Sequence, residues 1–280
     1  MSANEPPVPE SEEFWRDFLS GGHSKEHAAR RVLKLIPHSP RCRLCAAPFA
    51  GIGAPLMRMV GKRPSDKNPN WCASCFTFMS ENHGGAEIDC TLLFADVRGS
   101  TTLAEGMSAD EFRRLMDRFY DTAATAIFDN DGIVDKFVGD ELVAMFFPLL
   151  SGVRHAGRAV DAAQSLLRAT GHEDPNGPWV PLGAGVHTGV AWVGAVGRGT
   201  HTEMTALGDV VNTTARLAAA AEGGEILVTV DAAEAAGLDP SLERRPLALK
   251  GKQHLTEVVT LTVRSVQAVA AADSSPSTRT

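Results

Sequence analysis

Residues 92–101 read LLFADVRGST and residues 135–141 read DKFVGDE. Each stretch is an apolar, strand-like run that delivers one carboxylate, Asp96 or Asp140, into a turn. A strand fixes such a ligand in place, and a loop of small residues after it supplies backbone N–H groups for an anion. Two aspartates in this setting predict metal-assisted chemistry on a nucleoside triphosphate.

The pattern around these stretches predicts the fold. Ser108 and Glu111 form a capping box, and the apolar residues that follow recur at helical spacing. The other expected elements are a strand over 87–95, a hairpin of 133–138 and 142–147, a helix over 153–170, strands over 182–187 and 190–196, a helix after Gly208, and strands near 226–230, 242–249 and 256–263. This order is typical of an α+β, ferredoxin-like core with additions.

Composition narrows the class of protein. The 280 residues are 44% apolar and 22% charged, which is ordinary for a soluble globular protein of this length. No run approaches the eighteen or so apolar residues of a membrane span, so no membrane is expected. The acidic, proline-containing start lacks the features of a signal peptide, which favours a cytoplasmic protein. The net charge of −7 argues against a dominant nucleic-acid-binding role.

Three motifs carry a family resemblance. They are FADVRGST around Asp96, DKFVGDE with Lys136 and Asp140, and TALGDVVNTTAR over 205–216. Together they resemble the catalytic domain of a class III nucleotide cyclase, with motifs in matching order over roughly residues 88–263. The resemblance implies a lyase that converts ATP to 3′,5′-cyclic AMP and pyrophosphate. It also implies two Mg²⁺ or Mn²⁺ ions per site and a homodimer whose two sites each lie between the chains.

The same resemblance implies roles for single residues. Asp96 and Asp140 match the metal ligands, while Asn212 and Arg216 match residues that orient the ribose and stabilise charge on the α-phosphate. Asn212 and Arg216 stand at i and i+4, so they share one side of a helix. An arginine fork suits a phosphate because it donates several hydrogen bonds at fixed geometry.

Further positions are expected to bind the substrate. Lys136 and Thr205 match the base-recognition pair, and threonine in place of the mammalian-type aspartate resembles a bacterial subclass that makes cyclic AMP. Lys250 matches a lysine that reaches the triphosphate. The loop after Asp96 is expected to bring backbone amides to phosphate oxygens. Its residues are Val97, Arg98, Gly99, Ser100 and Thr101.

Four of the five cysteines form two C-x-x-C pairs, Cys42 with Cys45 and Cys72 with Cys75. In a reducing cytoplasm such pairs favour metal binding over disulfides. Residues 46–71 separate the pairs, and two such turns can close a tetrahedral four-cysteine zinc site. An iron–sulfur cluster or a thiol switch is the alternative.

The chain therefore divides into four expected parts. A helical segment over 1–37 and a four-cysteine, zinc-binding module over 38–83 precede the cyclase domain over 88–265, and a disordered tail covers 266–280. Two alternatives stay open for the function. The domain could cyclise another nucleotide, GTP or a pyrimidine triphosphate, or it could be a catalytically silent, dimeric signalling protein that binds a partner through the cysteine module.

Overall fold

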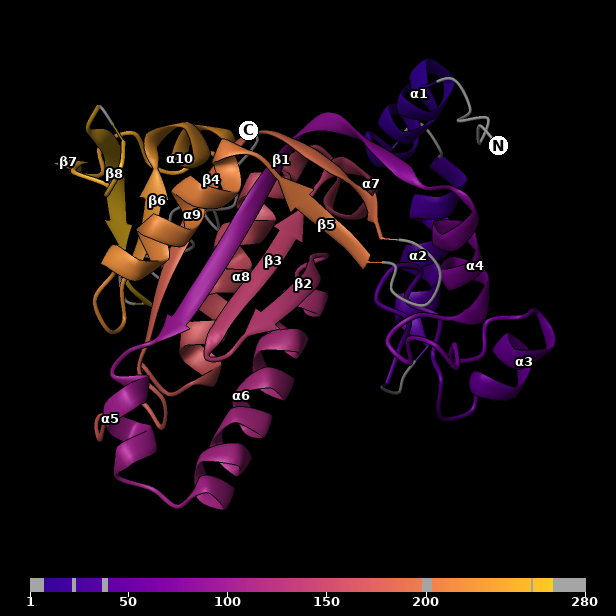
Figure 1. Cartoon of the computed structure of the whole chain (residues 1–280). Helices are drawn as coiled ribbons and strands as arrows, with labels where there is room; N and C mark the ends of the chain where they lie inside the picture. Colours follow the sequence, from indigo (N-terminus) through magenta and orange to yellow (C-terminus); the bar gives the residue numbers. More distant parts are fainter. Residues whose placement is uncertain (1–7, 22–23, 37–39, 198–202, 253, 264–280) are drawn as a thin grey trace, which may run out of the picture. The chain divides into compact units, whose positions relative to one another are not determined.

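The computed structural model describes residues 8–21, 24–36, 40–197, 203–252 and 254–263 (Figure 1). Two compact units make up the fold. The first contains the chain up to Asp89 together with Phe147–Val153 and Val190–Gly208, and the second contains Cys90–Phe146, Arg154–Gly189 and the chain from Asp209 onward. Among the described residues, no helix has the length and apolarity to cross a bilayer.

One mixed sheet runs through the fold in the order β2-β3-β1-β4-β6-β8-β7, with β5 paired to β4. Strand β3 pairs antiparallel with β1 and β2, β4 pairs parallel with β6, and β8 pairs antiparallel with β6 and β7. The strands are β1 (Gly84–Val97), β2 (Ile133–Val138), β3 (Glu141–Phe146), β4 (Leu182–Val196), β5 (Glu203–Leu207), β6 (Ile226–Thr229), β7 (Arg244–Leu247) and β8 (Thr256–Leu261). This mixed α+β sheet confirms the expected fold class.

Helices of the second unit cover the sheet and close its core. Helix α6 packs against β2 and α8, and α10 packs against α8 and β6. Ser108 caps α6 in the expected capping box, since its Oγ accepts from the Glu111 amide while the Glu111 carboxylate accepts from the Ser108 amide at 2.9 Å. The helices are α5 (Ser100–Glu105), α6 (Ala109–Asp129), α8 (His155–Ala169), α9 (Asp209–Ala220) and α10 (Val230–Ala236).

The first unit holds the cysteine pairs and an aromatic cluster. Trp15 is fully buried, and Phe14, Phe18 and Phe78 surround it with ring centroids 5.8–6.2 Å from its own. Such contacts hold the N-terminal helix on the cysteine-bearing segment. The helices here are α1 (Val8–Leu19), α2 (Ser24–Leu35), α3 (Ala54–Met59), α4 (Ala73–Glu81) and α7 (Pro148–Ser151), and the 3₁₀ turn η1 (Gly152–Arg154) follows α7.

Several elements differ from the sequence-based expectation. The two strands expected over 182–187 and 190–196 form one strand, β4, and Thr188 within it is fixed by a 2.8 Å hydrogen bond between its hydroxyl and that of Thr91. The strand expected over 226–230 ends at Thr229, whose hydroxyl caps the unexpected helix α10. The strand expected over 87–95 begins earlier, at Gly84, and a Cβ on Gly85 would lie 2.7 Å from the Gly194 Cα. The tail over 266–280 lies outside the described residues.

Candidate functional site

Asp96 and Asp140 come together at one end of the β1–β3 pair. Asp96 stands near the end of β1 and is paired in register with Glu141, and Asp140 lies in the tight turn before β3, after Gly139 at φ 62°. Burial, then hydrogen bonding with the Asp140 carboxyl, raises the pKa of Asp96 to about 6, against the opposing attraction of Arg98. Two carboxyl groups within hydrogen-bonding reach repel one another when both are ionised, so this pair suits a cation.

Arg98 connects this carboxylate to a helix much later in the chain. Its guanidinium pairs with the Asp96 carboxylate, and Nη1 also donates to the carbonyls of Ala219 at 3.1 Å and Ala221 at 3.3 Å. These carbonyls lie at the C-terminal end of α9, where helix carbonyls lack partners within the helix. The side chain expected only in a phosphate-binding loop therefore joins Asp96 to α9.

Glu141 is a third carboxylate that the sequence analysis did not select. Burial, then the charges of Asp96 and Asp140, raises the pKa of Glu141. Its position directly after Asp140, and across the sheet from Asp96, explains this influence. The signal was present in the sequence as the acidic pair Asp140-Glu141 at a hairpin turn, where one residue enters the strand that faces Asp96.

The loop after Asp96 turns directly into α5. The Arg98 amide donates to the Pro181 carbonyl at 2.8 Å, so this amide is used within the fold. Gly99 takes the left-handed conformation at φ 68°, and Ser100 begins α5. Its N-cap residue, Gly99, makes no side-chain hydrogen bond to the helix. The amides of Ser100 and Thr101 in the first turn therefore receive no side-chain cap.

Helix α9 and the loop at 249–252 bring the other expected residues together. Asn212 is exposed and Arg216 half-buried on α9. The Arg216 guanidinium lies against Gly251, where an added Cβ would come within 3.3 Å of Nη2. Gly251 has φ +78°, so the left-handed backbone and the nearby guanidinium both favour glycine at this position. The exposed Lys250 adjoins this contact, and Leu249 anchors the loop by packing into a small core with Leu217 of α9.

Lys136 lies in the second compact unit and Thr205 in the first. A bulge in β2 between Val134 and Lys136 interrupts the register with β3, and Lys136 Nζ lies 3.6 Å from the carboxylate of the neighbouring Asp135. Thr205 is buried in β5, paired across from Gly194 of β4.

The four cysteines form a compact cluster in the first unit. Their sulfur atoms all lie within 4.8 Å of one another, and the Sγ atoms of Cys45 and Cys72 are 3.7 Å apart. A tetrahedral zinc with bonds of about 2.3 Å would place its sulfurs roughly 3.8 Å apart, so the spacing fits. The hydrogen bond with Cys42 is the main cause that lowers the pKa of Cys72 to about 7, and it also lowers the pKa of Cys45. Lys62 Nζ lies 3.6 Å from the Cys45 sulfur.

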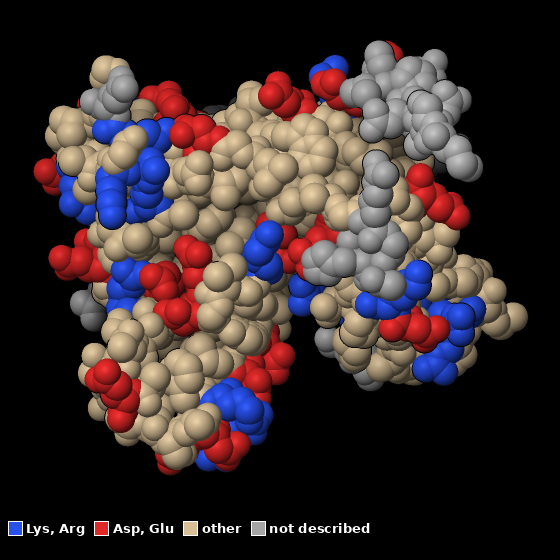
Figure 2. Space-filling model, in the orientation of Figure 1, with Lys and Arg blue, Asp and Glu red and all other residues tan. Residues whose placement is uncertain are grey.

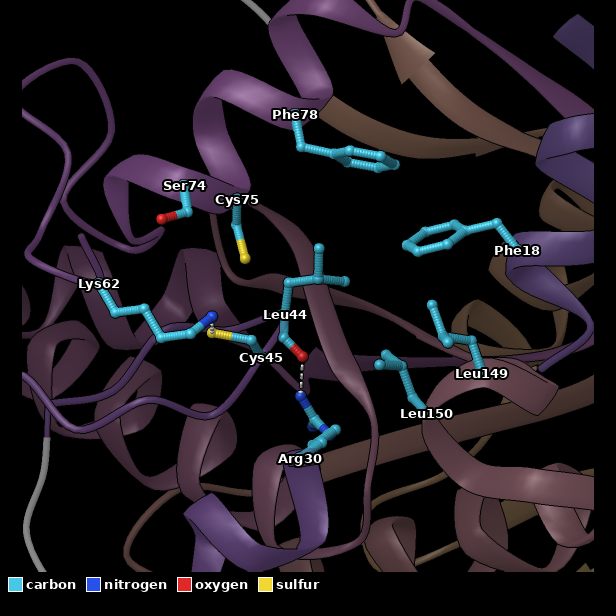
Figure 3. A pocket seen from close by; sticks show the side chains of 10 residues that line it. All are labelled: Phe18, Arg30, Leu44, Cys45, Lys62, Ser74, Cys75, Phe78, Leu149 and Leu150. Carbon is cyan, nitrogen blue, oxygen red and sulfur yellow. Dashed lines mark hydrogen bonds between the residues drawn. The ribbon is translucent and has the colours of Figure 1, made fainter. Parts of the chain in front are cut away.

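A cavity of about 220 Å³ adjoins this cluster (Figure 3). Cys45 and Cys75 form one part of its wall, and Lys62 reaches toward the Cys45 sulfur there. Its remaining lining is mainly apolar and comes from Phe18, Arg30, Leu44, Ser74, Phe78, Leu149 and Leu150. Two of the four thiols therefore face a cavity rather than packed protein.

Comparison with known proteins gives a consistent family. Residues 85–262 match the family described as the adenylate and guanylate cyclase catalytic domain. Adenylate cyclase 1 of Rhizobium meliloti (strain 1021) is 32% identical over 139 residues, which cover 46% of this chain and 20% of that protein. The adenylate cyclase of Anabaena cylindrica is 29% identical over 145 residues, which cover 50% of this chain and 29% of that protein. The chain spans less than a third of the length of either relative.

Solved structures of a guanylyl cyclase and of an adenylyl cyclase both resemble the chain. The guanylyl cyclase Cya2 has a TM-score of 0.58 and 26% identity, covering 63% of this chain and 93% of that one. The adenylyl cyclase CyaB from P. aeruginosa has a TM-score of 0.55 and 25% identity, covering 63% of this chain and 94% of that one.

Proposed function

The chain belongs to the adenylate and guanylate cyclase catalytic domain family, and from this premise we propose that it is an adenylate cyclase. In the reaction the ribose 3′-oxygen bonds to the α-phosphorus of ATP, the bond from that phosphorus to the bridging oxygen breaks, and pyrophosphate leaves. The observation that carries the proposal is the approach of the Asp96 and Asp140 carboxyls at the ends of adjoining strands. Adenylate cyclases among the relatives support the choice of nucleotide.

The residues at this end of the sheet fit a pair of divalent metal ions. Asp96 and Asp140 supply carboxylate oxygens, the ligands that Mg²⁺ and Mn²⁺ prefer, and Glu141 adds negative charge beside them. When bound, two such ions would acidify the ribose 3′-hydroxyl and neutralise the triphosphate. The chain itself contributes by fixing both carboxylates on a rigid hairpin and on the end of β1.

The remaining residues orient the nucleotide and stabilise its charge. Asn212 holds the ribose, and the Arg216 fork donates to the α-phosphate as charge develops there. Lys250, beside the Arg216–Gly251 contact, binds the triphosphate, and the Ser100 and Thr101 amides in the first turn of α5 bind its oxygens. Lys136 and Thr205 read the base, with the lysine donating to adenine.

The proposed enzyme is a homodimer with two equivalent sites. One chain supplies Asp96 and Asp140, and the other supplies Lys136, Thr205, Asn212 and Arg216. Each chain carries both sets, so isologous pairing completes two sites at once.

An assay of purified protein with each of the four nucleoside triphosphates tests this function. With Mg²⁺ or Mn²⁺, cyclic AMP identified by mass is expected as the main product. Asp96→Asn and Asp140→Asn keep the shape but change the ligand charge, and each should lower turnover by more than about 100-fold with the fold and dimer intact. Cyclic GMP as the main product would overturn the nucleotide assignment. Absence of any cyclic product from folded dimer would indicate the silent alternative, and near-wild-type turnover in either variant would contradict the metal assignment.

For the four cysteines we propose a structural zinc ion. Four sulfurs within 4.8 Å of one another, with the Cys45–Cys72 pair 3.7 Å apart, match the donor set that zinc prefers. The loop-rich segment that carries them has few core residues, so metal binding would contribute directly to its folding free energy. Elemental analysis of protein purified without added metal should find about one zinc per chain. Iron with visible absorbance would favour a cluster, and four free thiols without metal would favour a redox switch.

A further inference from the structure

Helix α3 presents an unusual set of apolar side chains to solvent. Ile52 is 89% exposed, Leu56 59%, Met59 84% and Val60 55%. Leu56, Met59 and Val60 stand at i, i+3 and i+4, so they share one face of the helix, and Ile52 precedes them by one turn. The opposite face is buried through Ala54 and Met57. Exposed aliphatic clusters of this kind mark binding surfaces.

The segment around this face is basic, although the whole chain is acidic. Residues 41–81 contain six arginines and lysines but only Asp66 and Glu81 as acids, in a chain of net charge −7. Arg58, Arg63 and Lys67 are exposed beside or just after α3. In Figure 2, Lys and Arg side chains lie next to the uncharged surface around α3, with a smaller group of acidic atoms between them. At physiological salt, screening weakens the interaction of exposed charges more than about 8 Å apart. The charges near α3 therefore determine which ligands this surface attracts.

Backbone bonds hold the apolar face in place on the cysteine-bearing segment. The Lys62 amide donates to the Met57 carbonyl at 2.8 Å, and Gly61 ends the helix at φ +77°. The Ser74 hydroxyl donates to the Gly61 carbonyl at 3.0 Å, and the Ala73 amide donates to the Arg63 carbonyl at 2.7 Å. The face is therefore fixed to the segment that carries Cys72 and Cys75, and it needs no folding step on binding.

We propose that this surface, formed by Ile52, Leu56, Met59, Val60 and the flanking Arg58, Arg63 and Lys67, docks the protein on an anionic lipid surface. Ile52 and Met59, exposed by 89% and 84%, protrude furthest from this cluster, and such aliphatic groups enter a fluid acyl layer without a preformed pocket. Arginine and lysine beside them pair with lipid phosphates. This contact is peripheral and does not need an apolar run long enough to span a bilayer.

Co-sedimentation with vesicles tests the proposal on the full chain. The wild type should bind vesicles of equal parts phosphatidylglycerol and phosphatidylcholine at least about tenfold more tightly than pure phosphatidylcholine, and high salt should weaken binding. Ile52→Ser with Met59→Ser should lower binding by about tenfold or more through lost apolar insertion. Arg58→Gln with Arg63→Gln should lower it about fivefold per charge, from roughly 1 kcal/mol each.

Matched controls separate the surface from general effects. Val153→Ser removes an equally exposed apolar side chain, at 93%, and Arg113→Gln with Arg114→Gln removes two exposed charges from α6. Both controls should bind like the wild type. Absent vesicle binding, or equal losses in controls and α3 variants, would overturn the proposal. If wild type ignores vesicles but the α3 variants change its oligomeric size, the face is a protein interface and the lipid proposal fails. None of these measurements depends on cyclisation.

Discussion

Arg98 and Asp96 form an ion pair in which the arginine also donates to the carbonyls of Ala219 and Ala221, in and just after the last turn of α9. The end of β1 and the helix that carries Asn212 and Arg216 are thus linked through one side chain. Because a guanidinium has five donors in a fixed fork, it can serve a carboxylate and two carbonyls at once, which a lysine ammonium cannot do at the same geometry.

Arg98→Lys should therefore lower both stability and metal use. We expect the free energy of unfolding to fall by about 1–3 kcal/mol, because two carbonyl contacts to a charged group are lost. The metal concentration for half-maximal activity should rise, since Asp96 is no longer held. Urea unfolding and metal titrations of activity measure the two effects. Arg244→Lys, in the exposed pair with Glu234, is the control and should change stability by less than about 0.5 kcal/mol. An Arg98→Lys protein with wild-type metal dependence would show that the link does not position Asp96.

Local sequence signals predicted where the two aspartates lie, whereas the contacts made by residues far apart in the chain could not be predicted. The placement of Asp96 and Asp140 follows from a strand and a tight turn, each readable within a few residues. The hydrogen bonds from Arg98 to Ala219 and Ala221 could not be predicted from the sequence, because these residues lie more than a hundred positions further along the chain. Glu141 is next to Asp140 in the sequence, but its place opposite Asp96 depends on the β1–β3 register.

Secondary structure shows the same division between local and distant causes. The capping box of α6 is a local signal, and it was predicted correctly. Strand β5 depends on pairing with β4, so it could not be predicted from its own residues. At Val230 an apolar run suggested a continuing strand, but the Thr229 cap turned the chain into α10.

The shared-site dimer can be tested by mixing two inactive variants. Asp96→Asn and Arg216→Ala should each be inactive alone, because each removes one half of every site. In a mixed dimer one site carries both substitutions and the other carries none, so random exchange should restore about a quarter of wild-type activity. Activity assays after subunit exchange, with exchange followed by a tagged chain, provide the measurement. Complete exchange without recovery would place Asp96 and Arg216 in the same chain's site or in different functions.

Lys136→Glu tests how the base is read. The substitution replaces a donor with an acceptor that faces the adenine N1 acceptor, so kcat/KM for ATP should fall by about 10-fold or more. A full switch to GTP is not expected, since Thr205 and the rest of the pocket are unchanged. Competition between ATP and GTP, with both cyclic products measured, gives the ratio directly. Unchanged preference for ATP would assign base recognition to another residue.

His172 should make the stability of the second compact unit depend on pH. The Leu182 amide donates to its Nε2 at 3.2 Å, while Nδ1 lies 3.1 Å from the Leu167 carbonyl, so the neutral ring protonated on Nδ1 satisfies both contacts. Burial lowers the pKa of His172, against the opposing hydrogen bond to Leu167. A second proton on Nε2 would face the Leu182 N–H and break this arrangement.

The sign of the effect follows from linkage. With its folded-state pKa below the unfolded value of about 6.5, His172 contributes its full stability above that pH and loses it as the pH falls toward the folded-state value. Urea unfolding at about pH 7.5 and pH 5.5 should show a loss on acidification that is smaller in His172→Gln, which cannot take up the proton. His254→Gln, at an exposed histidine, is the control and should keep the wild-type pH dependence. A His172→Gln protein that loses as much stability on acidification as wild type would assign the effect to other groups, of which His187, whose pKa burial also lowers, is the first to test.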